Sequence, residues 1–344
     1  MCIRDRLIAL LAVLAMVAAA CGGDDDSGGE GFEALDRDEL LQAAIDEGGQ
    51  LIVYSEATEA KNDLLIAAFR EKYPEIDVEY VRLTPPDLIA RYLAEKDAGA
   101  TVASVVQGTS ANFQAEQIEN GNFTALTEDL IPVLGEGYPD DFLRPETGNV
   151  VNSITLWGIC INTDIIAPAD APQEFADLAD PKYANEILLA DPNIADVYYG
   201  FWDTLVDEVG EDTVRGIAAN VSQVFPSGVP ATQAVGAGEG GVVLVCVPTL
   251  ATLVSNEGAP VEYIQPSLTS TFEHRPSISS DAPHPYKARL WIDFSVSREG
   301  IAAWAQFDAS PWEADQIPSG AKVPALDYLD RQDSLNEILG TSGG

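Results

Sequence analysis

Two adjacent tyrosines, Tyr198 and Tyr199, follow a turn in the stretch ADPNIADVYYGF, residues 190–201. Tyrosine oxygen ligates iron in some proteins, so the pair suggests a ferric iron site. Neighbouring residues of a helix point about 100° apart, however, so the two hydroxyl groups cannot easily reach one ion. The alternative is that Tyr199 packs in a core while Tyr198 lines the binding site of another ligand.

The rest of the chain offers no catalytic pattern. Its two histidines, His274 and His284, lie in a segment rich in proline and serine, and neither stands beside a nucleophile motif. A zinc site that combines them with Glu273 and Asp281 is the metal alternative, but histidines in loops are usually surface residues. The sequence contains no GxSxG, Walker or HExxH pattern. We therefore expect a protein that is not an enzyme and carries no cofactor.

The residues around these positions predict alternating strands and helices. GQLIVYS, IDVEYVRL and VASVVQG predict three strands, with helices expected over residues 62–74 and 86–99 between them. This βαβαβ order indicates a parallel sheet with helices on its faces. A second unit follows, with strands expected over residues 155–164, 184–192 and 241–249 and a loop expected at VFPSG, residues 224–228. The predicted fold class is therefore α/β.

Polar residues follow several of these strands, where each strand gives way to a helix. Open parallel sheets bind ligands at the carboxyl ends of their strands, and helix N-termini offer N–H groups and a positive dipole end there. Part of the signal has a second explanation, because Thr58, Ser110 or Asp196 could cap a helix instead. The candidate binding residues in these loops are Ser55, Glu56, Thr58, Thr109, Ser110, Asn193, Asp196, Ser227 and Gly228.

A few residues outside these loops complete the predicted site. They are Trp157, Tyr198, Thr249 and Arg275. Arg275, in the segment TFEHRPS that we expect to be a loop, is the predicted cation, because a guanidinium fork suits a carboxylate or phosphonate. A surface arginine is the alternative. The aromatic side chains of Tyr54, Trp157 and Tyr198 could instead surround an amine, with Glu56 as the counter-charge.

The charge balance excludes two classes of partner. The chain has 18 lysines and arginines against 56 aspartates and glutamates, a net charge of −38. Such a chain repels nucleic acid and anionic membrane surfaces, so we expect neither as a partner. The acidic residues are spread along the whole length, which is typical of a solvated surface.

The N-terminus predicts export. Arg4 and Arg6 precede an apolar run over residues 7–20 that suits the core of a signal peptide and is too short to span a bilayer. VAAAC resembles the lipobox of bacterial lipoproteins, which implies a signal peptide over residues 1–21, lipidation of Cys21 and attachment to the membrane through that anchor only. The alternative is an ordinary secretory signal peptide cleaved near Ala20. Residues 22–31 contain Gly, Ser and acids and predict a disordered tether. The mature protein would then lie at the outer face of the cell membrane or in the periplasm.

The two remaining cysteines, Cys160 and Cys246, lie in apolar, strand-like runs. Exported proteins meet an oxidising environment, so these cysteines can form a disulfide or stay as buried thiols. The spacing alone does not decide between these alternatives.

Segments spread over residues 50 to about 325 resemble one family. GQLIVYSEATEAKNDLLIAAFREKYPEIDVEYVRL is similar to the opening of the extracellular solute-binding proteins of ABC importers, in the group that includes the ferric-iron-binding proteins. The same family is resembled, in the same order, by VASVVQGTSANFQAEQIENG, FADLADPKYANEILLADP, ATQAVGAGEGGVVLV and ARLWIDFSVSREGIAAWA.

The resemblance implies a periplasmic-binding-protein-like fold of type II, with two lobes that close on a ligand in the cleft between them. It implies one lobe of residues 32–156 and 264–310 and another of residues 157–263 and 311–344. The implied function is delivery of a small-molecule solute to the permease of an ABC transporter, and we expect a monomer. A sensory or scaffold module with the same fold is the alternative.

The same resemblance argues against iron. In the ferric-binding relatives a tyrosine pair follows the strand after the Gly turn. The corresponding segment of this chain, VVLVCVPTL, has no tyrosine, and QGTSA, where the relatives' carboxylate is expected, has no Asp or Glu. We therefore expect an organic anion or zwitterion of the carboxylate or phosphonate type. The alternatives are Fe³⁺ with a synergistic anion, held by Tyr198 and Tyr199, and a polyamine or other organic cation.

Overall fold

The structure, a computed structural model, describes residues 33–304 and 308–341. The predicted signal peptide, Cys21 and the predicted tether over residues 22–31 lie outside the described residues. No helix in the described ranges is both long enough and apolar enough to cross a membrane. Residues 34–344 form one compact unit.

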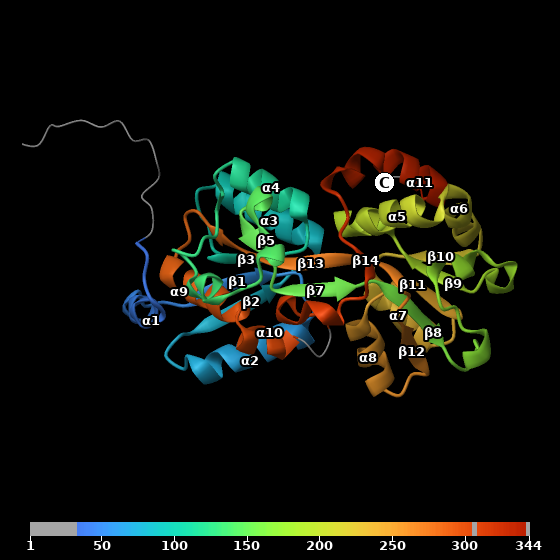
Figure 1. The fold of residues 1–344 in the computed structure, drawn as a ribbon, viewed down its shortest axis with the longest axis horizontal. Helices are drawn as coiled ribbons and strands as arrows, with labels where there is room; N and C mark the ends of the chain where they lie inside the picture. Colours follow the sequence, from blue (N-terminus) through green and yellow to red (C-terminus); the bar gives the residue numbers. More distant parts are fainter. Residues whose placement is uncertain (1–32, 305–307, 342–344) are drawn as a thin grey trace, which may run out of the picture. The chain divides into compact units, whose positions relative to one another are not determined.

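A mixed sheet of seven strands forms the first of two lobes (Figure 1). Its strands are β1 (Leu51–Ser55), β2 (Val78–Arg82), β3 (Val105–Gly108), β4 (Phe123–Thr124), β7 (Ser153–Leu156), β13 (Leu268–Ser279) and β14 (Gly320–Lys322). β1 pairs in parallel with β2 and β3, as the βαβαβ order predicts. β13 runs antiparallel to β3 and also pairs with β4, β7 and β14. A small separate sheet joins β5 (Leu143–Arg144) and β6 (Asn149–Val150).

Helices cover both faces of the first sheet (Figure 1). They are α1 (Arg37–Asp46), α2 (Glu59–Lys72), α3 (Pro85–Asp97), α4 (Ala111–Glu119), α9 (Pro285–Ser295) and α10 (Arg298–Trp304). The sequence explains where three of them begin, because Thr58, Thr84 and Ser110 accept hydrogen bonds from the first turns of α2, α3 and α4. Such caps satisfy N–H groups that the start of a helix leaves unpaired.

A second mixed sheet of five strands forms the other lobe. In spatial order its strands are β10 (Val221–Phe225), β9 (Ile187–Ala190), β11 (Val242–Cys246), β8 (Gly158–Asn162) and β12 (Val261–Ile264). β9 is parallel to β10 and β11, whereas β8 is antiparallel to both β11 and β12. The helices of this lobe are α5 (Asp196–Val209), α6 (Glu211–Ala219), α7 (Gly228–Gly236), α8 (Pro248–Asn256) and α11 (Gln332–Leu339).

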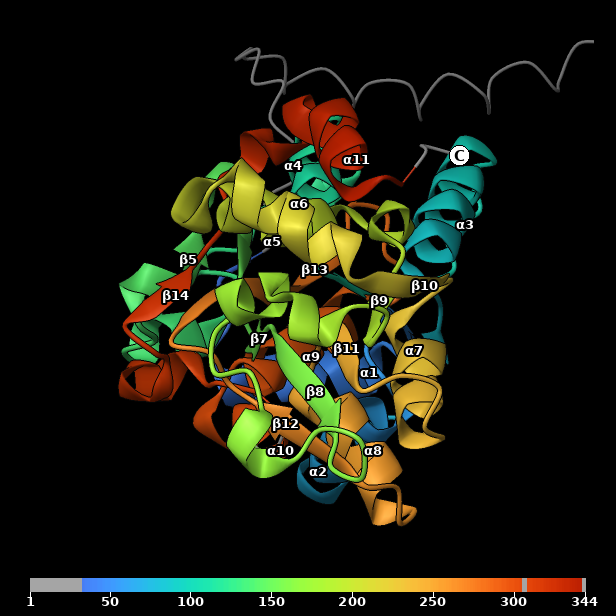
Figure 2. The ribbon, with the colours of Figure 1, turned by 90° about the vertical axis from the view of Figure 1, so that its right-hand side faces the viewer.

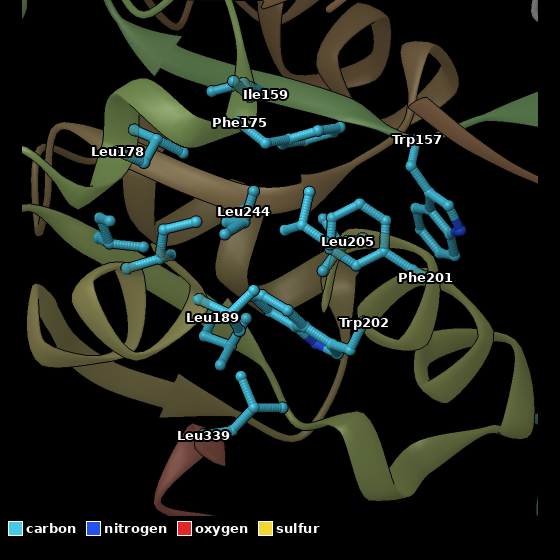
Figure 3. Close-up of a cluster of buried hydrophobic side chains, with 14 of the residues drawn as sticks. Trp157, Ile159, Phe175, Leu178, Leu189, Phe201, Trp202, Leu205, Leu244 and Leu339 are labelled. Atoms are coloured by element: carbon cyan, nitrogen blue, oxygen red, sulfur yellow. The ribbon is translucent and has the colours of Figure 1, made fainter. Parts of the chain in front are cut away.

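The second lobe has a core on each face of its sheet. α5, α6 and α11 lie over one face and α7 and α8 over the other (Figure 2). Under α5, the side chains of Phe201, Trp202 and Leu205 pack against Leu189 and Leu244 (Figure 3). These residues are almost entirely buried, and burial of one such side chain stabilises a fold by roughly 1.5–3 kcal/mol.

The chain crosses between the lobes at three places. β7 of the first sheet leads through Trp157 directly into β8 of the second, and β12 returns through residues 265–267 to β13. The tail divides: β14 pairs with β13 in the first sheet, and α11 then packs against α5 and α6 in the second lobe (Figure 1).

Several element predictions were wrong. Residues 155–164 do not form one strand, because β7 and β8 belong to different sheets. The segment TFEHRPS is part of β13 and not a loop, and residues 224–225, expected in a loop, end the edge strand β10. Neither segment has the apolar alternation that reveals a strand in the sequence. In β13 the alternation is missing because the strand buries polar residues such as Glu273 and Arg275, which pair with each other.

Cys160 and Cys246 form a disulfide between β8 and β11, with their Cα atoms 5.7 Å apart. Both side chains are fully buried in the core beneath α7 and α8. The sequence left the pairing open, and the fold decides it because the two strands are neighbours in the sheet.

Candidate functional site

A cavity of about 670 Å³ lies between the two lobes. From the first lobe it is lined by Glu56, Ala57, Thr58, Lys61, Arg82, Thr84, Pro85, Pro86, Thr109, Thr155, Phe272 and His274. The remaining lining is formed by Trp157, Ile194, Ala195, Val197, Tyr198, Pro226, Ser227, Gly228, Val229, Pro230, Val245, Val247, Thr249 and Leu250. Most of these residues lie where a strand ends and a helix begins, the usual ligand position in open α/β sheets.

Glu56 contributes a carboxylate to the first-lobe wall, and Thr109 donates two hydrogen bonds to it. The backbone N–H and the hydroxyl of Thr109 donate to Glu56 Oε2 at 2.9 and 2.8 Å. A Cβ at Gly108 would stand 3.3 Å from Glu56 Oε1, so glycine gives the carboxyl group room. Burial raises the pKa of Glu56 to about 7, against the opposing hydrogen bonds from Thr109. Glu56 therefore carries only part of a negative charge near neutral pH.

The cation deepest in the first-lobe wall already has a partner. Lys61 forms a buried ion pair with Asp308, which also accepts hydrogen bonds from the hydroxyls of Ser153 and Thr155. Burial alone would raise the pKa of Asp308, but the charge of Lys61 outweighs it, and the pKa lies below its ordinary value. Lys61 thus contributes little net charge to the cavity.

His274 lies beside this pair as a neutral imidazole. Burial, assisted by the charge of Lys61, lowers its pKa to about 3. Its Nδ1 atom has no hydrogen-bond partner among the described residues.

The second-lobe wall presents the starts of α7 and α8. No N-cap side chain accepts a hydrogen bond from the first turn of either helix. Thr249, in the first turn of α8, is 1% exposed, and its Oγ1 atom has no hydrogen-bond partner among the described residues. A helix N-terminus carries a partial positive charge, so the two starts together form a wall suited to an anionic group.

Aromatic rings form the apolar part of the cavity. The ring centroid of Trp157 lies 4.5 Å from that of Phe272 and 5.1 Å from that of Tyr198. Trp157 stands at the edge of the second-lobe core with its indole nitrogen directed away from the cluster (Figure 3). This Nε1 is buried without a hydrogen-bond partner in the part of the chain that the structure describes, and the indole as a whole is 3% exposed.

The structure places many of the predicted site residues in the cavity lining. They are Glu56, Thr58, Thr109, Trp157, Tyr198, Ser227, Gly228 and Thr249. Of these, Thr58 is also the N-cap of α2, as the alternative explanation of its position predicted.

Four predicted residues form hydrogen bonds with other side chains of the protein and do not line the cavity. Ser55 Oγ donates to Asn62 Oδ1 at 2.8 Å. Asn193 accepts a hydrogen bond from Tyr199 and donates to Asp191 at 2.8 Å. The carboxylate of Asp196 accepts from the hydroxyls of Ser110 at 2.5 Å and Tyr328 at 3.1 Å. Ser110 also caps α4, so the Ser110–Asp196 bond joins the first lobe to the second.

The cation that stays unpaired in the described lining of the cavity is not the predicted one. Arg275 is buried on β13, donates to Glu273 from Nε at 3.0 Å, and lines a separate small pocket instead of the large cavity. Arg82, which the sequence analysis missed, ends β2 at the rim of the cavity. Its exposed side chain has no ion-pair or hydrogen-bond partner in the described ranges. Its position near the end of a predicted strand, four residues before the helix expected from residue 86, was the available signal.

The two tyrosines have separate surroundings. Tyr198 lines the cavity, while Tyr199 is buried against α11, where Asn336 donates to its hydroxyl at 3.1 Å. Burial raises the pKa of Tyr198 to about 12, against an opposing backbone hydrogen bond from Gly228. Within residues 33–304 and 308–341, no group of three or more His, Cys, Asp or Glu side chains is placed to hold a metal ion.

Residues 100–330 match the family model described as bacterial extracellular solute-binding protein. A protein of Haemophilus influenzae named only as uncharacterized is 29% identical over 272 residues, which cover 76% of this chain and 77% of that protein.

Solved structures share the fold. The substrate-binding protein of an ABC transporter from Agrobacterium tumefaciens has a TM-score of 0.72 at 16% identity, covering 85% of this chain and 94% of that one. The periplasmic binding protein AfuA from Actinobacillus pleuropneumoniae, with fructose-6-phosphate bound, has a TM-score of 0.68 at 24% identity, covering 86% and 99%. Iron-bound HitA from Pseudomonas aeruginosa has a TM-score of 0.67 at 17% identity, covering 85% and 100%.

Proposed function

Because this chain belongs to the family of bacterial extracellular solute-binding proteins, we propose that it captures a small organic anion or zwitterion of the carboxylate or phosphonate type in the cleft between its lobes. The fold is the two-lobed α/β fold of type II periplasmic binding proteins. The chain is the solute-binding component of an ABC importer, a transport component and not an enzyme. The permease of that importer would receive the bound solute.

The start of α8 is the observation that carries the proposal. Its helix dipole points a partial positive charge into the cavity, and the buried hydroxyl of Thr249 has no partner among the described residues. A buried hydroxyl without a partner costs about 1–3 kcal/mol, which a ligand oxygen would recover. The start of α7, with Ser227 and Gly228, adds a second positive dipole end to the same wall.

The first-lobe wall supports an anion with an organic body. Arg82 supplies a cation without a partner in the described ranges, whereas the raised pKa of Glu56 limits the opposing negative charge. The volume of about 670 Å³ exceeds what a bare ion fills, and the aromatic and aliphatic side chains of the lining suit a carbon skeleton.

The same features weigh against the two alternatives. A polyamine needs ionised carboxylates, and among the described residues Glu56 is the only carboxylate in the cavity lining, with a pKa raised to about 7. A ferric site of the tyrosine-pair type needs two phenolates, and Tyr198 is the only tyrosine in the described part of the lining, with a pKa raised to about 12. Iron-bound HitA shares the fold at 17% identity, and a likeness at that level of identity indicates a common fold but not a common ligand.

A thermal-shift screen of the protein with methylphosphonate, phosphonoacetate, succinate, spermidine and ferric citrate tests the proposal. We expect an anion among the first three to raise the melting temperature by about 5 °C or more at saturation. A shift with ferric citrate alone would overturn the proposal, provided that it brings a visible tyrosine-to-iron absorption that is lost in Tyr198→Phe. Tyr80→Phe, which alters a tyrosine outside the cavity, is the matched control.

We extend the proposal to the N-terminus, where Cys21 would carry the lipid anchor. Radiolabelled palmitate should enter the wild-type protein in cells and should not enter Cys21→Ser. Cells with the variant should release the protein in soluble form, and release of the wild type to the same extent would contradict the anchor.

A further inference from the structure

The disulfide closes directly behind the wall that faces the solute. Cys246 is the last residue of β11, and α8 begins two residues later at Pro248. Cys160 lies on the neighbouring strand β8, opposite Val243. The bond therefore attaches the chain covalently just before it enters the cavity lining.

A bulge makes this bond possible. In a regular strand side chains alternate between faces, so residues 243 and 246 would point to opposite faces of the sheet. The pairing of β11 with β8 skips Val245, since Leu244 stands opposite Ile159 and Cys246 opposite Gly158. As a result Leu244 and Val245 both face the core under α5, and Cys246 turns to the core that holds Cys160.

The bulge residue adopts a backbone conformation that valine avoids. Val245 has φ +29°, and positive φ in a β-branched residue is an outlier that persists only where the surroundings enforce it. Val245 is 1% exposed and is followed directly by the bridged Cys246. The buried side chain of Val245 and the disulfide at Cys246 together restrain the backbone in this conformation.

The bulge also sets which residues reach the solute. Val245, Val247 and Thr249 all line the cavity, and Val247 is the N-cap of α8. A regular strand would turn each following side chain to the other face and would redirect the first turn of the helix.

We propose that the Cys160–Cys246 disulfide, acting through the bulge at Val245, positions the first turn of α8 and the hydroxyl of Thr249 for solute binding. The inference rests on the proposed function of the cleft. α7 offers an internal comparison, because it lines the same wall but follows β10, whose residues include no cysteine.

Amide hydrogen exchange tests the positioning role without a ligand. Leu250 and Ala251 donate their amides to the Val247 carbonyl in the first turn of α8, and Ala231 donates to Ser227 at the same place in α7. In the full-chain variant Cys160→Ala/Cys246→Ala, we expect the α8 amides to exchange about tenfold faster and the α7 amide to change less than about twofold. Equal acceleration in both helices, or none in either, would overturn the proposal.

The control is Val243→Ala, which removes a buried side chain from the same strand and core but leaves the disulfide in place. It should lower the melting temperature to a similar extent while the α8 amides keep the same exchange rate relative to the α7 amide. Selective acceleration in α8 by this control would show that any loss of packing suffices, and it would also overturn the proposal.

A binding measurement links the positioning to function. With methylphosphonate as the probe in calorimetry, the disulfide-free variant should bind about tenfold more weakly, and Val243→Ala should bind like the wild type. Equal affinity of the disulfide-free variant and the wild type would overturn the positioning role. If the wild type binds none of the organic anions of the screen, the proposed function fails, whereas the exchange experiment still decides the role of the disulfide.

Discussion

The two walls of the cleft differ in how far their polar groups are already satisfied. In the first-lobe wall, Glu56 accepts two hydrogen bonds from Thr109, and Lys61 is paired with Asp308. In the second-lobe wall, the starts of α7 and α8 have no capping side chain, and Thr249 keeps an unpartnered hydroxyl within the described residues. The first wall thus pairs its charged groups internally, whereas the second leaves the Thr249 hydroxyl open within the described residues.

This difference has a physical cause. Charged groups that are buried without a partner cost far more free energy than an unpaired hydroxyl or helix terminus does. A protein that must stay folded while empty therefore pairs its buried charges internally and leaves the milder donors open. Changes in the first wall should consequently affect stability most, and changes in the second should affect affinity.

The largest effect is expected from Asp308→Asn, because it leaves the charge of Lys61 buried without a counter-charge. We expect a loss of about 3–5 kcal/mol in the free energy of unfolding, measured by urea denaturation. The double variant Lys61→Met/Asp308→Leu is the control and should lose less, since no charge is left unpaired. A loss below about 1 kcal/mol in the single variant would contradict the view that the paired charges of the first wall serve stability.

Glu56 should make stability depend on pH in the opposite direction from an ordinary carboxylate. Its pKa in the folded protein, about 7, lies above the ordinary value of 4.5, so the folded state binds the proton more tightly than the unfolded state. The contribution is fully favourable below about pH 4.5 and is lost as the pH rises through about 7.

We therefore expect Glu56→Gln to remove a decline in stability between pH 5 and 7 of at most about 1.4 kcal/mol per pH unit. Urea midpoints of both proteins across that range provide the measurement. Parallel curves for variant and wild type would show that the Glu56 carboxyl titrates normally and that the first wall carries a full negative charge.

Thr249→Val should separate affinity from stability in the second wall. The substitution keeps the shape of the side chain and removes the hydroxyl, so binding of an anionic solute should weaken about tenfold while the melting temperature of the empty protein stays the same or rises. Thr252→Val, one turn along α8 and outside the cavity lining, should change neither quantity. Calorimetry with the anion selected by the screen would reveal equal affinity if the hydroxyl plays no part.

The smallest effect is expected at the rim, from Arg82→Gln. Because this side chain is exposed, its attraction to an anion is screened, and affinity should fall only about twofold to fivefold. The difference between variant and wild type should shrink as salt is raised from 0.05 to 0.5 M, with a Debye length of about 4 Å at the upper end. A salt-independent difference would place Arg82 in direct, enclosed contact with the solute.

Much of the fold could be predicted from the sequence, because the relevant signals are local. The strands β1, β2 and β3 appear as short β-branched runs, and the caps Thr58 and Ser110 stand where the helices begin. β13 escaped prediction because its middle residues are polar and are satisfied by distant partners, among them Arg144, which donates to Glu273 at 3.0 Å. No local period reveals such a strand.

The candidate site was predicted less well for the same reason. Arg275 and Arg82 look alike in the sequence, yet one is tied to Glu273 and the other reaches the cavity without a described partner. Asp196 stands at a helix start as expected, but its carboxylate accepts from Ser110 of the other lobe. Residue type and spacing indicate which groups can bind, whereas competition from partners far along the chain decides which groups are left to do so.

The sequence by itself determined the α/β order of elements, most of the loops that approach the cleft and the absence of recognised catalytic motifs, since these follow from short-range periodicity and residue type. Only the tertiary structure decided that Cys160 pairs with Cys246, that Arg275 is tied to Glu273, and that the Thr249 hydroxyl has no partner among the described residues. The physical reason is that hydrogen bonds, ion pairs and disulfides join residues that only the folded chain brings together, and a binding site is made of the groups that such pairings leave open.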